Sequence, residues 1–206
     1  MRISPAFHAR ATAAYWSSVV KTHADMSEES FDFYAAHIAT LLGPPEQAGR
    51  VLDHGAGDGK IGMRLRKLGY NVEFSEFATQ FIASIRAAGF TCHHVDECPL
   101  GRFDTIFVNN AIFYVHPSKL LRQIQWLLDR TGSKGSLFLL DVPTSQRSHF
   151  LVGGALKRLV WRLTGVYQPD AGGFFVDENR VSRHFNNVKV QQGWCDYRCH
   201  LIIHKS

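Results

Sequence analysis

The sequence predicts an α/β fold, in which a doubly wound and mostly parallel sheet carries helices on both faces. Short apolar segments alternate along the chain with stretches of helical periodicity, as they do in repeated βαβ units. The stretch from residue 50 to residue 82 joins two such segments through a glycine-rich turn and a helix. With 206 residues, of which 45% are hydrophobic, the chain is long enough for one well-buried domain.

The glycine-rich turn follows a short apolar strand that ends at Asp53. Three glycines stand after it at alternate positions, namely Gly55, Gly57 and Gly59. Glycine adopts backbone conformations that are closed to other residues, and it lets a ligand approach the backbone closely. A second strand ends near Glu76, 21 residues after Gly55, where a carboxylate can accept both hydroxyls of a ribose. These features together indicate a nucleoside-binding βαβ unit.

The order of the glycines separates the two classes of cofactor that use such a unit. Dinucleotide-binding loops have the pattern GxGxxG, which places a pyrophosphate on the N-terminus of the helix. Here the pattern is GxGxG, and Asp53 precedes it. A carboxylate at Asp53 would repel a pyrophosphate but suits a ligand that carries an ammonium group. The segment resembles motif I, E/DxGxGxG, of the class I S-adenosylmethionine-dependent methyltransferases, and it matches at each signature position.

This resemblance implies a Rossmann-like, doubly wound, seven-stranded sheet that is mostly parallel with the last strand antiparallel, and S-adenosyl-L-methionine as the cofactor. It implies that Asp53 and the glycine loop hold the methionine moiety and that Glu76 holds the ribose. Asp96 would accept the adenine amino group, and Phe77 would pack on the base. The cofactor-binding residues implied in this way are Asp53, Gly55, Ala56, Gly57, Gly59, Glu76, Phe77, Asp96, Glu97 and Asn109.

The first half of the chain supplies four predicted helices and three predicted strands besides the glycine turn. Residues 9–20 can form a helix with aromatic side chains on one side. A further helix should end at Leu42, because apolar residues recur at helical spacing up to it and Gly43 follows. Beyond them we expect strands over 51–53, 70–74 and 90–95, and helices over 61–68 and 78–88.

The second half continues the alternation. Phe103-Asp104 matches the usual opening of the fourth strand in the resembled family, and Pro117 should start a helix with a stripe of leucines. The elements expected here are a strand over 103–110, the helix from 117, a turn over 131–135, a strand over 136–140 that ends at Asp141, a helix over 177–185, and strands over 188–197 and 199–204.

We divide this single domain into four parts: an N-terminal helical cap (1–45), a cofactor-binding core (46–143), a lid-like insertion (144–176), and a closing helix and strand hairpin (177–206). The stretch 151–163 within the insertion is basic and amphipathic. It can pack on the sheet as a lid over the substrate pocket, or it can contact a membrane surface or a lipid-linked substrate.

Four side chains are candidates for the acceptor end of the site. The segment after the fourth strand resembles that of small-molecule methyltransferases, with Tyr114 at the place of a family histidine and an imidazole displaced to His116. Asp141 should stand at the end of the fifth strand, and His149 lies in the insertion. Methyl transfer needs alignment more than acid catalysis, so a base helps only where the acceptor atom carries a proton.

Composition limits the other classes of function. The net charge of +5 comes from basic residues that are spread along the chain, so we expect no nucleic-acid partner. The four cysteines show no CxxC spacing, and we expect no metal site. No apolar run approaches the roughly 20 residues that span a bilayer, and no signal-peptide pattern is present, so we expect a soluble, cytoplasmic protein.

The methyl acceptor is expected to be a small molecule with a sugar, glycan or natural-product hydroxyl or amine. One compact domain with a short lid offers an enclosed pocket and no added recognition module. The alternatives are a nucleic-acid or protein methyltransferase, and a non-catalytic S-adenosylmethionine-binding subunit that keeps the fold. Only turnover separates an enzyme from such a subunit.

Overall fold

The computed structural model describes residues 28–144, 174–194 and 198–205. The helix expected over 9–20, His149, the stretch 151–163 and the rest of the insertion up to residue 173 lie outside the described residues.

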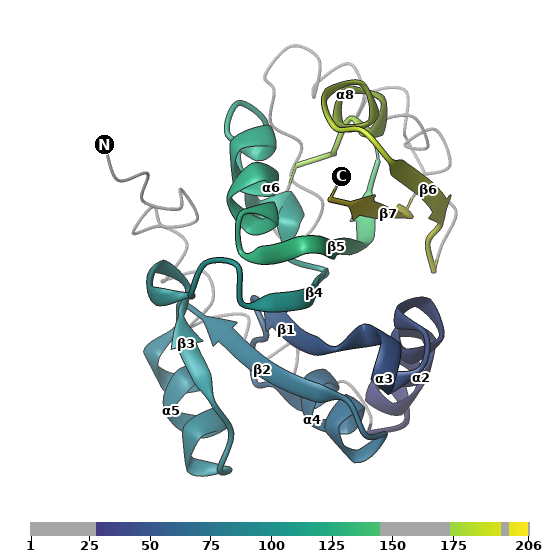
Figure 1. Cartoon of the computed structure of the whole chain (residues 1–206). Coiled ribbons are helices and arrows are strands. Elements are labelled where there is room, and N and C mark those ends of the chain that lie inside the picture. The colour runs from purple at the N-terminus through teal and green to yellow at the C-terminus, as the bar shows by residue number, and fades with distance from the viewer. Residues whose placement is uncertain (1–27, 145–173, 195–197, 206) are drawn as a thin grey trace, which may run out of the picture.

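One mixed sheet forms the centre of the described part of the chain (Figure 1). Its strand order is β3-β2-β1-β4-β5-β7-β6, and each neighbouring pair of strands is parallel except the two pairs that β7 makes with β5 and β6, which are antiparallel. This confirms the predicted fold class, including the antiparallel last strand. The strands are β1 (Arg50–His54), β2 (Asn71–Glu76), β3 (Cys92–His94), β4 (Phe103–Asn109), β5 (Thr131–Pro143), β6 (Val188–Gln192) and β7 (Arg198–His204).

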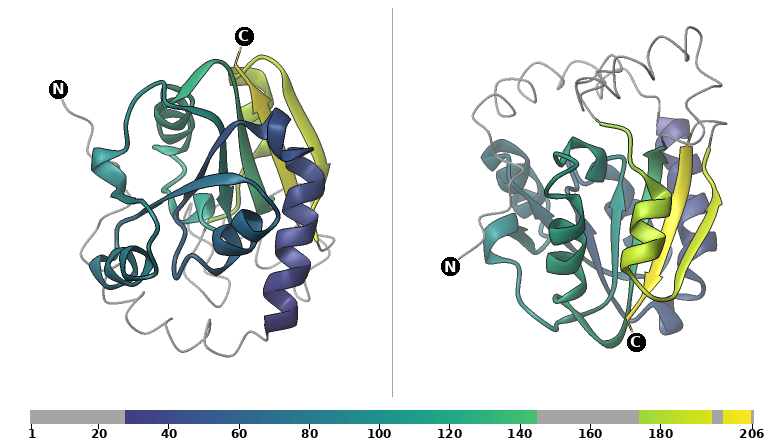
Figure 2. Two further views of the ribbon diagram at one scale, coloured as in Figure 1. Left: turned by 60° about the horizontal axis from the view of Figure 1, so that its bottom comes forward. Right: turned by 90° about the horizontal axis from the view of Figure 1, so that it is seen from above.

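Helices cover both faces of the sheet, as Figures 1 and 2 show. One face carries α2 (Glu28–Leu42), α4 (Lys60–Lys67) and α5 (Thr79–Ala87), and the opposite face carries α6 (Leu120–Leu128) and α8 (Glu178–His184). The short α3 (Pro45–Ala48) and the single turns η1 (Val95–Glu97) and η2 (Ile112–Tyr114) complete the described elements.

Each face of the sheet has its own apolar core, because alternate residues of a strand point to opposite sides. Val51 and Phe107 belong to the core beneath α2, α4 and α5, whereas their neighbours Leu52 and Ile106 belong to the core beneath α6 and α8. All four side chains are fully buried. The central strands are therefore buried on both faces, which is why they read as continuous apolar runs in the sequence.

Several boundaries differ from those expected, among them the end of β6, which lies at Gln192 instead of residue 197. The turn predicted over 131–135 is part of β5, although the register with β4 shifts there. The helix expected from Pro117 begins at Leu120, since the His116 carbonyl accepts the Lys119 N–H and closes a separate turn first. The third strand covers only Cys92–His94, because the His94 side chain accepts the Asp96 N–H there and η1 begins.

Candidate cofactor and acceptor site

The glycine loop leaves β1 in a conformation that explains its sequence. Gly55, Gly57 and Gly59 have φ angles of 72°, 58° and 76°, in the left-handed region that favours glycine. A Cβ atom at Gly59 would lie 2.9 Å from Ile85, whereas one at Gly57 would meet nothing within 4 Å. The loop is therefore packed against α5 at its last glycine and open at its middle glycine.

Glu76 ties this loop to the end of β2. Its Oε2 accepts the N–H of Gly57 at 2.7 Å, and its Oε1 accepts the N–H groups of Phe77 and Ala78 at 2.8 and 3.1 Å. Burial raises the pKa of this carboxyl, and these backbone bonds oppose the rise. The sequence pointed only to a ribose contact and gave no sign that the same side chain anchors the loop.

Asp53 is buried beneath the first turn of α4. The backbone N–H of Gly62 donates to its carboxyl, and a Cβ atom at Gly62 would lie 2.7 Å from Asp53 Oδ2. Burial, together with the negative charge of Glu76, raises the pKa of Asp53 to about 8. The fold thus holds a buried carboxyl next to the glycine loop, and no cation among the described residues contributes to its raised pKa.

The other residues that the resemblance implied lie at the same edge of the sheet or in the turns that follow it. Asp96 and Glu97 are exposed in η1, two and three residues beyond His94, which pairs with Glu76. Phe77 is half-buried directly after β2. Asn109 ends β4, and its buried Oδ1 has no hydrogen-bond partner among the described residues. The implied residues therefore lie at or just after the ends of β1, of β2 and β3 on one side of it, and of β4 on the other side.

A second cluster stands at the ends of β4 and β5. Arg198, at the start of β7, donates from Nη1 to Asn110 Oδ1 at 2.7 Å, to Asp141 Oδ2 at 2.8 Å and to the Asp141 carbonyl at 2.7 Å. Asn110 and Asp141 have φ angles of 53° and 54°, a conformation that is uncommon for residues other than glycine. Strained backbone of this kind clusters at functional sites.

A bulge in β5 sets the position of Asp141. Leu139 pairs with Leu201 and Val142 pairs with Cys199, so two residues of β5 face the single residue His200. The Asp141 N–H donates to His200 Nδ1 at 3.1 Å. Burial lowers the pKa of His200 to about 4, so the imidazole is neutral and can accept this bond.

Tyr114 and His116 follow the end of β4 and are the other described candidates for proton transfer. Tyr114 is half-buried in η2, with its ring 4.4 Å from that of Phe113. His116 is exposed, and its Nδ1 lies 2.8 Å from Ser118 Oγ. Burial raises the pKa of Asp141, and Arg198 opposes that rise. Of the described candidates, Asp141 is thus the one held in a buried, charge-paired position.

The two described ends of the predicted insertion meet at this same edge. Thr144 and Val176 pair as a parallel bridge, and the Val176 N–H donates to the Pro143 carbonyl at 2.9 Å. The Phe174 N–H donates to the carbonyl of Phe113 in η2 at 2.7 Å. The two described ends of the insertion therefore lie side by side at the end of β5.

Comparison with known proteins identifies the architecture. No protein-family model matches the sequence, and no curated protein sequence matches it. Solved structures do match. A SAM-dependent methyltransferase from Archaeoglobus fulgidus superposes with a TM-score of 0.62 at 10% identity, over 85% of this chain and 94% of that one. The chain has the class I methyltransferase fold.

Other methyltransferase structures share this fold. The magnesium protoporphyrin IX methyltransferase of Synechocystis PCC 6803, with bound SAH, gives a TM-score of 0.57 at 16% identity over 87% of this chain and 83% of that one. The glycopeptide N-methyltransferase MtfA, complexed with sinefungin, gives 0.58 at 16% identity, over 83% and 91%. Within this fold, the described residues include no group of side chains that could hold a metal ion. They also include no helix of the length and apolarity that crossing a bilayer requires.

Sequence reasoning missed Arg198, Asn110 and His200. None belongs to a motif, and Arg198 is 57 residues from Asp141 and 88 from Asn110. The only local signal was the position of Asp141 at a strand end. The bulge that turns this residue toward β7 depends on pairing between strands and leaves no pattern in the sequence.

Proposed function

We propose that this chain is an S-adenosylmethionine-dependent methyltransferase that acts on a small-molecule acceptor. The observation that carries the proposal is the convergence of Asp53, Glu76 and the open glycine loop at one edge of the sheet. The ends of parallel strands in a doubly wound sheet are where such folds bind their ligands. The methyltransferase fold of the chain agrees with this reading.

The residues present fit the cofactor. Asp53 is a buried carboxyl with a raised pKa, and the ammonium group of a methionine moiety would supply the positive charge that it lacks. The Asn109 Oδ1 atom, which has no partner among the described residues, offers a further acceptor. Glu76 would accept the ribose hydroxyls, and Asp96 and Phe77 would contact the adenine. We assign Gly55, Ala56, Gly57 and Gly59 to the backbone surface against which the ligand lies.

When bound, S-adenosylmethionine supplies an electrophilic methyl group on a sulfonium. The chain's own contribution is to orient the acceptor atom in line with that methyl group and to exclude water. Where the acceptor atom carries a proton, we assign its removal to Asp141, because burial raises the pKa of this carboxyl and makes it a stronger base. Tyr114 and His116 remain candidates from η2 and the turn after it.

A small molecule with a hydroxyl or amine suits the acceptor end of the site. The Asp141 carboxylate and the Asn110 amide, held together by Arg198, form a polar cluster that can accept hydrogen bonds from such a group. A sugar, a glycan or a natural product carries groups of this kind. The fold supplies no added nucleic-acid recognition element among the described residues.

Calorimetric titration tests the cofactor assignment. We expect S-adenosylhomocysteine to bind more tightly than NAD. We also expect binding near pH 7 to release protons, because a ligand ammonium would lower the pKa of Asp53 from about 8. Titrations in two buffers with different heats of ionisation measure that release, and Asp53→Asn should abolish it. Tighter binding of NAD than of the sulfur nucleoside would overturn the assignment.

Turnover tests the activity. Labelled S-adenosylmethionine is incubated with separate sets of small hydroxyl and amine compounds, nucleic acids and proteins. We expect label to appear in the small-molecule set. Transfer only to nucleic acid or protein would contradict the proposed acceptor class, and binding without any transfer would favour a non-catalytic subunit.

A further inference from the structure

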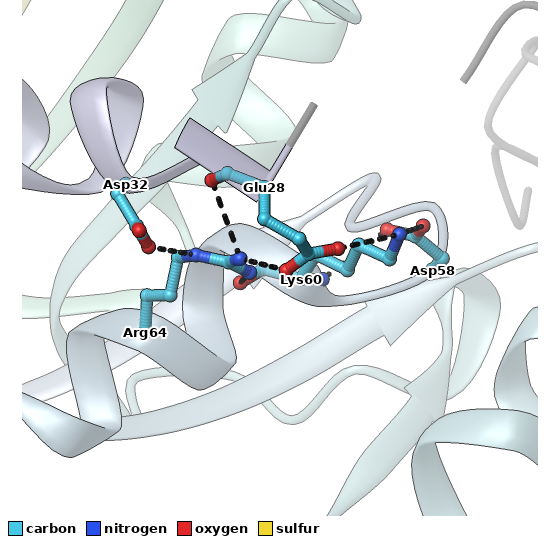
Figure 3. Close-up of polar contacts among 5 residues, drawn as sticks. All are labelled: Glu28, Asp32, Asp58, Lys60 and Arg64. Carbon is cyan, nitrogen blue, oxygen red and sulfur yellow. Dashed lines mark hydrogen bonds and ion pairs between the residues drawn. The ribbon is translucent and has the colours of Figure 1, made fainter. Parts of the chain in front are cut away.

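A cluster of charged side chains joins α2 to α4 beside the glycine loop (Figure 3). Arg64 donates from Nε to Asp32 Oδ1 at 2.5 Å and from Nη2 to Glu28 Oε2, and Lys60 Nζ lies 3.4 Å from Glu28 Oε1. Lys60 Nζ also lies 3.9 Å from Asp58 Oδ2, within the loop itself. We refer to Glu28, Asp32, Asp58, Lys60 and Arg64 as the clasp.

The spacing of these residues makes the clasp possible. Glu28 and Asp32 are four apart on α2, and Lys60 and Arg64 are four apart on α4, so each pair lies on one face of its helix. The two faces meet with opposite charge: Arg64 contacts both Glu28 and Asp32, and Lys60 contacts Glu28. Such an arrangement fixes how far α2 is shifted along α4 and also the distance between the two helices.

Arg64 is the centre of the clasp. Its side chain is 14% exposed, whereas those of Glu28 and Asp32 are 71% and 68% exposed. The guanidinium also donates to the backbone carbonyl of Lys60 at 3.1 Å and lies 5.2 Å from the ring centroid of the buried Phe31. Packing and the bond to Lys60 therefore fix the guanidinium of Arg64, and the exposed carboxylates of α2 bind to it from the solvent side.

The clasp acts at the point where the glycine loop becomes a helix. Lys60 directly follows Gly59, and its N–H donates to Asp58 Oδ1 at 3.2 Å. One half-turn further on, Gly62 touches Asp53 and has no room for a side chain. The first turn of α4 thus has Asp53 on its inner side and the clasp on its outer side.

We propose that Glu28, Asp32 and Arg64 are positioning residues for the sulfur-nucleoside site, although none of them touches the glycine loop. They hold the first turn of α4, and with it the loop and Gly62, in the position that the cofactor requires. This inference rests on the proposed function. Because both acidic partners of Arg64 are exposed, salt screens these ion pairs, so the affinity for the cofactor should fall as ionic strength rises.

The test is calorimetric titration with S-adenosylhomocysteine at low and high salt. This probe carries no net charge at neutral pH, so its own attraction to the protein depends little on salt. We expect Arg64→Met, which keeps an apolar stem against Phe31, to weaken binding by about three- to tenfold at low salt. High salt should weaken wild-type binding toward the Arg64→Met value and should change the variant little. Arg64→Lys, which keeps the charge, should recover part of the affinity and part of the salt dependence.

Two further variants make the result decisive. Lys67→Met removes a charge from an exposed position of the same helix outside the clasp, and it should bind as wild type does at both salt concentrations. Asp32→Asn removes one exposed partner and serves if Arg64→Met does not fold. Equal affinity of wild type and both clasp variants at low salt would overturn the inference alone. Failure of the wild type to bind the probe would overturn the proposed function as well.

Discussion

Replacement of Glu76 by glutamine is the most informative single change in the site. Both carboxylate oxygens accept backbone N–H groups, Oε2 from Gly57 and Oε1 from Phe77 and Ala78. A glutamine side chain of the same shape has only one acceptor oxygen. If that oxygen keeps the bonds to Phe77 and Ala78, the amide NH2 group must face the N–H of Gly57. Gly57 then loses its bond to Glu76, while Gly55 and Ala56 still donate to the Ser75 carbonyl of β2.

The size of the effect follows from these bonds. A hydrogen bond to a charged group contributes about 1.5–3 kcal/mol, and a buried donor left without a partner costs about 1–3 kcal/mol. Glutamine also removes the cost of burying a charge, which the raised pKa of Glu76 reflects. We therefore expect a net loss of about 1–3 kcal/mol in the free energy of unfolding. At about 2–4 °C per kcal/mol for a chain of this size, Tm should fall by roughly 2–12 °C.

Scanning calorimetry and titration with S-adenosylhomocysteine measure the two consequences of Glu76→Gln. Affinity should fall about tenfold or more, because the ribose would lose a charged acceptor and the loop its anchor. Glu29→Gln, an exposed change on α2, is the matched control and should leave both quantities unchanged. A Tm within about 1 °C of wild type, whatever the affinity, would show that the carboxylate does not hold the loop.

Three further predictions concern packing, charge pairing and pH. Gly62→Ala should lower stability by about 1–3 kcal/mol, since its Cβ would lie 2.4 Å from a fully buried ring, whereas Gly132→Ala has ordinary space and should be neutral in thermal denaturation. Arg198→Met should raise the pKa of Asp141 further and cost about 3 kcal/mol, and adding Asp141→Asn should recover most of that loss in a double-mutant cycle; no recovery would contradict the pairing. Burial alone would raise the pKa of Glu73, but bonds from a histidine and two arginines lower it to about 2. This carboxylate therefore stabilises the fold above about pH 4.5, and up to roughly 3 kcal/mol is lost as pH falls toward 2; Glu73→Gln should flatten acid unfolding in that range, and an unchanged curve would refute the assignment.

The fold could be predicted largely because its signals are local. The glycine loop, the carboxylates after two strands and the helical periodicity of α2, α6 and α8 each occupy a short stretch of sequence. The ends of strands and helices could not be predicted where pairing with a neighbouring strand sets them. The stretch 131–135 contains Gly132 and Gly135 and resembles a turn, yet pairing of Thr131 with Phe103 keeps it within β5.

The sequence by itself determined the strand-loop-helix unit around Asp53 and predicted the class of ligand that it suits, because those residues act through backbone that lies next to them in the chain. Only the tertiary structure decided which distant groups complete the site. Arg198 reaches Asp141 across 57 residues, and Arg64 reaches Glu28 across 36. Each contact requires two packed elements to be aligned in one particular way along their lengths, and sequence periodicity does not specify that alignment. A bulge in β5 and the alignment of α2 on α4 supply that register, and so it is the packing of elements that gives these charges their partners.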